Sequence, residues 1–245
     1  MDKVCIVIPC YNEQHRLQSS EYTNFYNDSD FHFLFVNDGS TDFTLKILNK
    51  INKFREDRIS ILNMDKNQGK GEAVRRGVLY ADSLNKYSII GFLDADLSTP
   101  LTEIPNLISH FKKEELFIFG SRFKRIGVDI KRKVYRHYLG RIFATLASNM
   151  LEIPVYDTQC GAKFFKSEVV EFIFTDHFKS NWTFDLEIFY RFLNKYDHLN
   201  LNSIAKEIPL EKWEDKDGSK IRFKHFVKVP FDLIRLYFFY NIKKD

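Results

Sequence analysis

Two acidic side chains, Asp94 and Asp96, directly follow an apolar segment at residues 87–93, and their spacing could bind a metal ion. Residues two apart in an extended chain point to the same side, so the two carboxylates would lie together. Such hard oxygen ligands suit Mg²⁺ or Mn²⁺, with a substrate phosphate completing the coordination shell. The alternative is an ordinary turn at the end of a strand, in which an Asp caps the following segment.

Two further apolar segments also end in polar or acidic groups, which favours the metal site over the ordinary turn. Residues 4–8 lead to Glu13, and residues 31–36 lead to Asp38. In open parallel α/β sheets, ligands bind at the carboxyl ends of the strands, where these groups would converge. We therefore expect Asp94 and Asp96 to hold Mg²⁺ or Mn²⁺ at this edge.

The segments that must position these groups alternate between apolar strands and amphipathic helices. Nearly continuous apolar strands separated by helices predict an α/β fold whose central sheet is mostly parallel, with helices on both faces. We expect a single domain over residues 1–245, with a nucleotide half at 1–121, an acceptor half at 122–222 and a C-terminal amphipathic helix at 223–245. The expected strands are 4–8, 31–36, 58–62, 87–93, 116–119 and 204–210.

Composition excludes several classes of protein. The three cysteines, Cys5, Cys10 and Cys160, include no Cys-x-x-Cys pair, which argues against a disulfide framework and a structural zinc site. A formal net charge of +4 is too small to indicate a nucleic-acid-binding protein. No uncharged apolar run is long enough to span a bilayer. We expect a cytoplasmic protein that is soluble or lies peripherally on the cytoplasmic face of a membrane.

Two common nucleotide-binding motifs are missing. No Gly-x-Gly-x-x-Gly follows the first strand, so a dinucleotide fingerprint is absent. Residues 67–71 contain a Gly-Lys pair, but Met64 stands in place of the first glycine of a phosphate-binding P-loop, and Gly71-Glu72 replaces its Ser/Thr. Two interpretations of the pair stay open, a simple helix start and a site at which Lys70 faces a nucleotide.

Five motifs in order, PCYNE, VNDGSTD, NQGKGEAVRRG, LDADLSTP and GSRF, closely resemble those of the family 2 glycosyltransferases of the GT-A fold. In the second half, DTQCGAKFF, WTFDLEI and IPLEKW with GSKI resemble the dolichyl- or polyprenyl-phosphate β-glucosyltransferases, with polyprenyl-phosphate mannose synthases as close relatives. The resemblance covers about residues 3–222. The chain departs from these relatives at Ala162, where a bulky aromatic is common.

The resemblance implies roles on the donor side. Asp94 and Asp96 would join the metal to the diphosphate of a nucleotide sugar, Asp96 acting as a catalytic group. Arg122 would meet phosphate or the donor sugar. The nucleotide pocket would be lined by Pro9, Tyr11 and Glu13, with Asp38 on the base or ribose and Ala95 beside the ribose.

The basic stretch at residues 124–141 would hold the acceptor. A phosphate monoester is largely ionised at neutral pH, with a second pKa of roughly 6. Such an acceptor needs positive charge to hold it rather than a base to deprotonate it. Related mannose synthases place an Arg at the position of Arg136, which is therefore the first candidate, with Arg141 next.

Three features of the second half carry two interpretations each. The resemblance places Asp185 at the catalytic centre, as a base or as a group that orients the donor, whereas an acid at a helix start is also favoured by the helix dipole. Lys220 lies in a polar turn and could close over the diphosphate. The aromatic C-terminal segment fits an interfacial helix on a membrane or a final core helix equally well.

Together these features predict a metal-dependent, inverting glycosyltransferase that moves a hexose, plausibly glucose from UDP-glucose, onto polyprenyl or dolichyl phosphate. Inversion is implied by the resemblance alone. The rivals are a soluble transferase that adds a sugar to a hydroxyl in surface polysaccharide, a non-catalytic nucleotide-sugar-binding membrane scaffold, and a nucleotidyltransferase. The partners we expect are a nucleotide sugar, a lipid phosphate and a membrane surface, and no nucleic acid.

Overall fold

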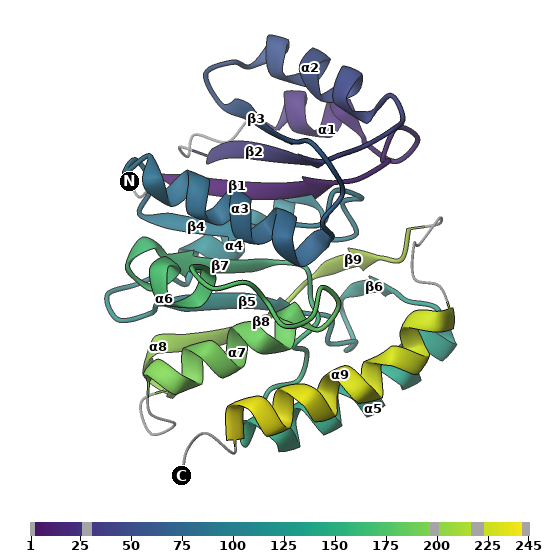
Figure 1. The fold of residues 1–245 in the computed structure, drawn as a ribbon, viewed down its shortest axis with the longest axis vertical. Coiled ribbons are helices and arrows are strands. Elements are labelled where there is room, and N and C mark those ends of the chain that lie inside the picture. Colours follow the sequence, from purple (N-terminus) through teal and green to yellow (C-terminus); the bar gives the residue numbers. More distant parts are fainter. Residues whose placement is uncertain (1–2, 26–30, 197–200, 217–222, 242–245) are drawn as a thin grey trace.

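A seven-stranded sheet forms the centre of the computed structural model, which describes residues 3–25, 31–196, 201–216 and 223–241. The strand order is β3-β2-β1-β4-β7-β5-β8, and every neighbouring pair is parallel except the two that involve β7 (Figure 1). A separate two-stranded ribbon pairs β6 with β9 in parallel. The strands are β1 (Val4–Cys10), β2 (Phe31–Asp38), β3 (Ile59–Met64), β4 (Ile89–Phe92), β5 (Phe117–Ser121), β6 (Asp129–Lys131), β7 (Lys163–Lys166), β8 (Ala205–Pro209) and β9 (Lys212–Glu214).

Helices cover both faces of the sheet. The helices are α1 (Ser19–Asn24), α2 (Thr44–Phe54), α3 (Lys70–Ser83), α4 (Ile104–Ser109), α5 (Val134–Leu151), α6 (Val170–Phe174), α7 (Phe184–Lys195), α8 (Leu201–Ile204) and α9 (Phe223–Asn241), with short 3₁₀ turns at Leu101–Glu103 and Ser167–Val169. The predicted α/β class with a mostly parallel sheet is confirmed. None of the described helices is long and apolar enough to cross a membrane.

Two hydrophobic clusters, one on each face, explain why the strands are apolar on both sides. Successive strand side chains point to opposite faces, so Val7 of β1 joins the cluster that contains α3 and α7, whereas Ile6 and Ile8 join the other. The same alternation separates Phe165 from Phe164 on β7. This double burial matches the near-continuous apolar runs from which a parallel sheet is expected.

Strand β7 is the part of the sheet that the sequence pattern does not reveal. It runs antiparallel between β4 and β5, pairing Phe92 with Lys163 and Phe117 with Phe165. Its four residues include two lysines, which hides it among polar segments. Gly91 allows the close approach of this strand, since a Cβ there would lie 2.2 Å from a ring carbon of Phe164.

Glu72 joins helix α3 to the chain that follows α6. Its carboxylate accepts hydrogen bonds from Arg75 at 2.8 and 2.9 Å and from Arg76 at 2.9 Å, and lies 3.0 Å from His177 Nδ1. Arg75 in turn donates to the Thr175 carbonyl at 2.8 Å. Burial raises the pKa of Glu72, but the bonds from Arg75, Arg76 and His177 outweigh it and lower the pKa to about 2.

Replacing Glu72 with Gln should lower the free energy of unfolding by about 2 kcal/mol near neutral pH, because hydrogen bonds to a charged group are lost. The folded-state pKa lies below the ordinary value of 4.5, so this stabilisation is complete above that value and disappears as the pH falls towards about 2. Urea unfolding at about pH 7 and about pH 3 measures the difference, with the exposed Glu56→Gln as control. An equal loss at both pH values would contradict the assignment.

Candidate active site

The turn that follows strand β4 places Asp94 and Asp96 at the carboxyl edge of the sheet. The N–H of Leu97 donates to the Asp94 carbonyl at 3.2 Å, and Leu97 adopts a left-handed backbone with φ of 53°. Asn12, in the turn after β1, has φ of 49°. This conformation is unfavourable for a residue such as leucine, whereas asparagine adopts it more readily, and it clusters at functional sites. Both strained turns lie at the edge where the sequence predicts the site.

Each carboxylate of the pair contacts a basic side chain. Lys70 Nζ lies 2.6 Å from Asp94 Oδ1, and Arg16 Nη2 forms an ion pair with Asp96 Oδ2. Asp96 Oδ1 also accepts the N–H of Ser98 at 3.0 Å. The Asp94 side chain remains 36% exposed, so an incoming ligand can reach it. Lys70 was a predicted site residue; Arg16 was not.

The described residues fit a cation that takes part of its shell from a substrate. Asp94 and Asp96 supply hard oxygen donors on one edge of the sheet, as Mg²⁺ and Mn²⁺ prefer. Within the described ranges, no group of three or more His, Cys, Asp or Glu side chains could hold a metal without further help. The remaining ligands would therefore be phosphate oxygens or water.

Gly161 brings the turn after Cys160 into direct contact with Asp94. A Cβ at this position would lie 2.1 Å from Asp94 Oδ2, closer than real Cβ contacts allow. Cys160 is fully buried, and burial raises its pKa to about 12, so it is a packed thiol at neutral pH. The glycine therefore lets the TQCG segment form one wall of the site.

Asp38 shapes the loop that begins helix α3. Its carboxylate accepts the N–H of Gln68 at 2.7 Å, the N–H of Gly69 at 2.9 Å and the amide of Asn67 at 2.8 Å. Burial raises the pKa of Asp38, and the two backbone bonds oppose that rise. Asp38 is 2% exposed. Its three hydrogen bonds fix the loop directly before Lys70 and so help to hold Lys70 in place.

The other predicted donor-side residues gather near the end of β1. Glu13 is buried, its N–H donates to Thr44 Oγ1 at 2.7 Å, and its carboxylate lies 3.5 Å from Arg16. Pro9 and Tyr11 are half-buried. Ala95 is buried, and its carbonyl accepts a bond from the Tyr22 hydroxyl at 3.4 Å. Helix α1 thus supports the turn at residues 94–97 through the Tyr22 hydroxyl.

Asp185 forms a buried ion pair with Lys163. Lys163 Nζ lies 2.5 Å from Asp185 Oδ1 and donates to the Cys160 carbonyl at 2.7 Å. The Lys163 side chain has no exposed surface and that of Asp185 has 6%. A buried charge requires such a partner, since an isolated one would be very costly. One ammonium group therefore joins strand β7, the TQCG turn and the start of α7.

Arg122 and Arg136 both pair with buried acids. Arg122 forms a two-point contact with Asp157 at 2.7 and 2.8 Å, and Arg136 Nη1 lies 2.5 Å from Asp215 Oδ1. Burial raises the pKa of Asp157, but the charge and hydrogen bonds of Arg122 lower it to about 2. The Arg122 guanidinium also lies 5.4 Å from the centre of the Trp213 ring. Both arginines are thus already engaged by acids of the chain.

Comparison with known proteins gives a consistent family. The model of glycosyl transferase family 2 matches residues 5–174. The chain belongs to this family. It is 31% identical to a dolichyl-phosphate beta-glucosyltransferase of Saccharomyces cerevisiae, over 98% of this chain and 76% of the relative. A Dictyostelium discoideum protein of the same name is 30% identical, over 96% of this chain and 74% of the relative.

Solved structures of low identity share the fold. Glucosyl-3-phosphoglycerate synthase from Mycobacterium tuberculosis in complex with UDP superposes with a TM-score of 0.66 at 16% identity, covering 97% of this chain and 79% of that one. A mannosyltransferase from Pyrobaculum calidifontis in complex with GDP-Man and Mn²⁺ gives 0.62 at 14%, covering 99% and 64%. The chain is a glycosyltransferase with the GT-A fold.

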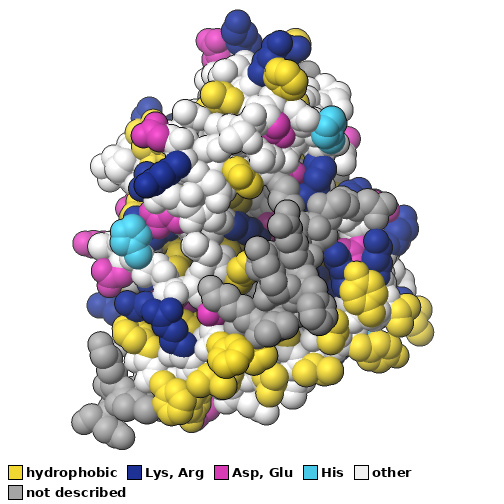
Figure 2. Space-filling view, turned by 45° about the vertical axis from the view of Figure 1, so that its right-hand side comes forward, with side chains coloured by type: hydrophobic (Ala, Val, Ile, Leu, Met, Phe, Trp, Pro, Cys, Tyr) yellow, Lys and Arg dark blue, Asp and Glu magenta, His cyan; other side chains and the backbone are white. Residues whose placement is uncertain are grey.

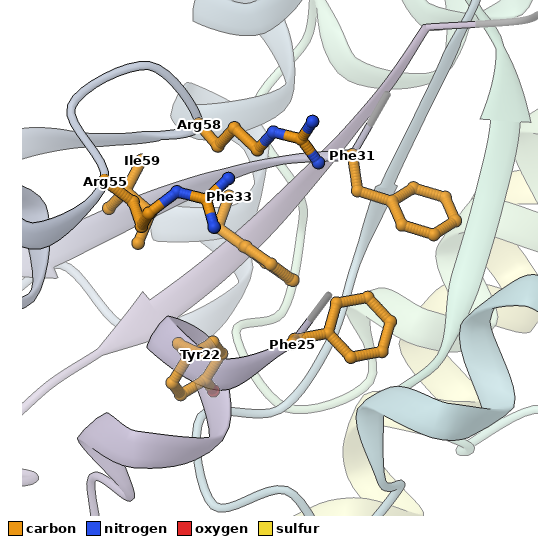
Figure 3. A pocket seen from close by; sticks show the side chains of 7 residues that line it. All are labelled: Tyr22, Phe25, Phe31, Phe33, Arg55, Arg58 and Ile59. Atoms are coloured by element: carbon orange, nitrogen blue, oxygen red, sulfur yellow. The ribbon is translucent and has the colours of Figure 1, made fainter. Parts of the chain in front are cut away.

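Lys220, the residue predicted to close over the diphosphate, falls outside the described residues. A small aromatic pocket, shown in Figure 3, lies at the amino ends of β2 and β3, opposite the site. It contains none of the predicted site residues and is lined by Tyr22, Phe25, Phe31, Phe33, Arg55, Arg58 and Ile59.

Replacing Gly161 with Ala should push Asp94 out of position and weaken the Mn²⁺-dependent binding of a nucleoside diphosphate by at least about tenfold. The expected cause is the 2.1 Å approach to Asp94 Oδ2. Calorimetric titration with and without Mn²⁺ measures the effect. Gly120→Ala is the matched control, because its Cβ would meet Leu210 at 3.0 Å and Cys160 at 3.3 Å but not Asp94. Equal weakening in both variants would contradict the role of Gly161.

Proposed function

We propose that this glycosyltransferase transfers glucose from UDP-glucose to polyprenyl or dolichyl phosphate, with inversion, using Mg²⁺ or Mn²⁺. The observation that supports it most is the Asp94 and Asp96 pair at the carboxyl edge, contacted by Lys70 and Arg16. The names of the yeast and Dictyostelium relatives support the choice of sugar and acceptor.

The leaving diphosphate is the group that most needs stabilisation. Asp94 and Asp96 would hold the cation, which when bound offsets the negative charge that develops on the diphosphate. Lys70 and Arg16 already lie beside the two carboxylates and would add positive charge at the same place. Lys220 would close over the diphosphate from its polar turn. The N-terminal end of α3 adds the positive end of its dipole.

The two halves of the chain would divide the reactants between them. Residues 1–121 would bind the nucleotide sugar, with Pro9, Tyr11 and Glu13 along the nucleotide and Ala95 beside the ribose. Asp38 would act mainly by holding the loop at residues 67–69, given its three hydrogen bonds there. Residues 122–222 would receive the acceptor, and the single catalytic unit would span residues 1–245.

Asp185 would orient the donor rather than accept a proton. Its carboxylate lies 2.5 Å from Lys163 Nζ and its side chain is only 6% exposed, so one of its oxygens is already engaged in a buried ion pair. A phosphate monoester acceptor with a second pKa of roughly 6 brings its own negative oxygen to the reaction. Of the two roles that the resemblance implies for Asp185, the Lys163 contact therefore supports orientation of the donor rather than general base catalysis.

The acceptor phosphate would bind at the start of α5. Arg132 lies against Gly140, since a Cβ added at Gly140 would lie 2.4 Å from the Arg132 guanidinium. Arg141 donates to the Tyr156 carbonyl at 3.2 Å. Burial and the positive charges of Arg132, Lys124 and Arg141 lower the pKa of His137. This concentration of positive charge suits a dianion better than a neutral hydroxyl. Arg136 and Arg122, each held in place by its acidic partner, would complete the site.

The enzyme would act peripherally on the cytoplasmic face of a membrane, because a polyprenyl chain keeps its phosphate at the bilayer surface. Long apolar chains partition into the bilayer with about 0.8 kcal/mol per buried CH₂. The transferase must therefore approach the lipid, and exposed hydrophobic side chains on α5 and α9 support such a position.

The first experiment is transfer of radiolabelled glucose from UDP-glucose to polyprenyl phosphate in the presence of Mg²⁺ or Mn²⁺. We expect label in the organic-extractable lipid, and less or none from UDP-galactose, UDP-N-acetylglucosamine or GDP-mannose. Asp94→Asn and Asp96→Asn should each lower turnover at least about 100-fold, since charge stabilisation in the transition state is lost.

Three outcomes would contradict the proposal in different ways. Unchanged turnover in both Asn variants would remove the metal assignment. Label in a sugar hydroxyl acceptor but never in lipid would move the acceptor to polysaccharide. Metal-dependent nucleotide-sugar binding with no turnover on any acceptor would indicate the scaffold instead.

Arg132→Ala and Arg136→Ala should each raise the KM for polyprenyl phosphate about tenfold while leaving the KM for UDP-glucose unchanged, because each removes a charge near the acceptor phosphate. Steady-state kinetics with both substrates varied measures the split. Lys50→Ala is the control, since Lys50 is exposed on α2, away from the basic stretch at residues 124–141. A collapse of UDP-glucose affinity would place these arginines on the donor side.

A further inference from the structure

Helix α9 has two apolar faces, and only one of them is covered by the described part of the chain. Leu233, Leu236 and Tyr240 are buried in the cluster that contains α7. On the other side, Phe231 is 69% exposed, Ile234 55% and Phe238 54%. An ordinary surface helix presents polar side chains to solvent, so an exposed row of this kind marks an interaction surface.

Helix α5 continues the exposed surface. Both helices contact Tyr190 of α7, which donates to the Met150 carbonyl at 3.2 Å and stacks on Tyr240 at 5.0 Å. They run along the lower edge of Figure 1, and Figure 2 shows hydrophobic side chains gathered along that edge. The docking face comprises Val134, Tyr135, Tyr138, Leu139, Ile142 and Leu146 of α5 with Phe231, Ile234, Tyr237 and Phe238 of α9.

The charges beside the docking face fit an anionic bilayer. Lys124 and Arg125 before β6, Lys131 at the end of β6 and Lys133 just before α5 are all exposed. Figure 2 shows Lys and Arg side chains directly above hydrophobic ones in this part of the molecule. Exposed tyrosines among the apolar residues also suit the interface between headgroups and hydrocarbon. Basic residues next to an apolar helix face are the features that bind anionic lipid.

The covered side of α9 reaches the segment that carries Asp185. Asp232, which is 6% exposed, accepts a hydrogen bond from the Ser180 hydroxyl at 2.8 Å. Ser180 Oγ in turn accepts the N–H groups of Trp182 at 3.2 Å and Thr183 at 3.3 Å. Thr183 precedes the first residue of α7, and Asp185 lies in the first turn. Ser180 thereby satisfies backbone donors at a helix start, with Asp232 fixing its hydroxyl.

A second contact holds the same segment from its other end. Tyr240 donates to Glu187 Oε1 at 2.8 Å, and Glu187 Oε2 accepts the N–H of Lys179 at 2.7 Å. Arg191 donates to the same Glu187 oxygen as Tyr240, at 2.9 Å. Glu187 has no exposed surface. Residues 179–187 are therefore hydrogen-bonded to α9 at two points about two helical turns apart.

We infer that α9 docks on an anionic membrane through its outer face and fixes the position of Asp185 through its inner face, with Asp232 and Ser180 as positioning residues. The inference rests on the proposed function, because it assigns the membrane as the partner of a lipid-phosphate glycosyltransferase. Docking holds α9 in place, and α9 holds the turn before α7. The catalytic centre is thus most ordered when the enzyme lies on the surface that carries its acceptor.

The positioning part is tested with Asp232→Ala and Ser180→Ala. Each should lower kcat roughly 10- to 100-fold, because a small displacement of Asp185 is costly, while the KM for UDP-glucose and vesicle binding stay unchanged. The double variant should be no slower than either single one, since both remove one link. Asp232→Asn keeps an acceptor oxygen and should retain most of the activity. Additive losses, or unchanged kcat in both single variants, would overturn the link.

An activity-independent measurement guards against variants that only destabilise the fold. Hydrogen exchange should show faster exchange at the Trp182 and Thr183 amides in Asp232→Ala, with the strand amides of β1 and β4 unchanged. Adding vesicles should slow exchange at the same two amides in the wild type. Faster exchange throughout the sheet, or no change at Trp182 and Thr183, would refute the positioning role.

The docking part is tested by sedimentation with vesicles of phosphatidylcholine and phosphatidylglycerol. The double variant Phe231→Gln/Phe238→Gln should lose at least about tenfold in vesicle affinity, since two large apolar side chains no longer enter the interface. Phe43→Gln/Phe54→Gln is the matched control, because these α2-end phenylalanines are 67% and 75% exposed elsewhere on the molecule. Equal losses in both variants, or a concentration-dependent dimer abolished by the α9 variant, would overturn the membrane assignment.

The two proposals fail in distinguishable ways. If the wild type transfers no sugar to any polyprenyl phosphate, the proposed function is wrong, whereas vesicle sedimentation and amide exchange still report on α9. If lipid is glucosylated, but Phe231→Gln/Phe238→Gln binds vesicles like the wild type and Asp232→Ala exchanges its amides like the wild type, the function stands and the inference about α9 is wrong.

Discussion

The pairing of buried or half-buried acids with positive groups at one sheet edge is the constraint on which the rest of the site depends. Asp94, Asp96 and Asp185 would repel one another if unpaired, and each contacts a basic side chain: Lys70, Arg16 and Lys163 in turn. Each of these cations comes from a different element. The start of α3, the turn after β1 and strand β7 must therefore all reach the same edge to supply these three cations.

This constraint explains why much of the fold, but less of the site, could be predicted from the sequence. Local apolar runs predict strands such as β1 and β4, and the acids of the site follow these strands closely in the chain. The partners of those acids are not local, since Arg16 lies 80 residues from Asp96 and Lys163 lies 22 from Asp185. No periodicity reports such contacts. Lys163 lies in the DTQCGAKFF motif, but nothing in that motif indicates Asp185 as its partner.

The C-terminal helix shows a different limit. Its pattern was compatible with an interfacial helix and with a core helix, and the structure contains features of both, because Leu236 is 1% exposed while Phe231 is 69% exposed. Helical periodicity indicates which faces of a helix are apolar, but not which of them the rest of the chain covers. Asp232 adds to the ambiguity, since a buried carboxylate in an apolar helix has no sequence-level explanation until Ser180 is seen beside it.

The arginines of the second half separate two kinds of positive charge. Arg122 and Arg136 are bonded to Asp157 and Asp215, so their charges are largely balanced within the protein and their side chains are held in fixed positions. Arg132 and Arg141 also lie over aromatic rings, Trp213 at 6.0 Å and Tyr156 at 3.7 Å, but neither forms an ion pair with an acid among the described residues. A ring face orients a guanidinium without neutralising it. The balanced pair therefore shapes the acceptor half of the site, and the ring-held pair leaves net positive charge where a doubly charged phosphate would gain most from it.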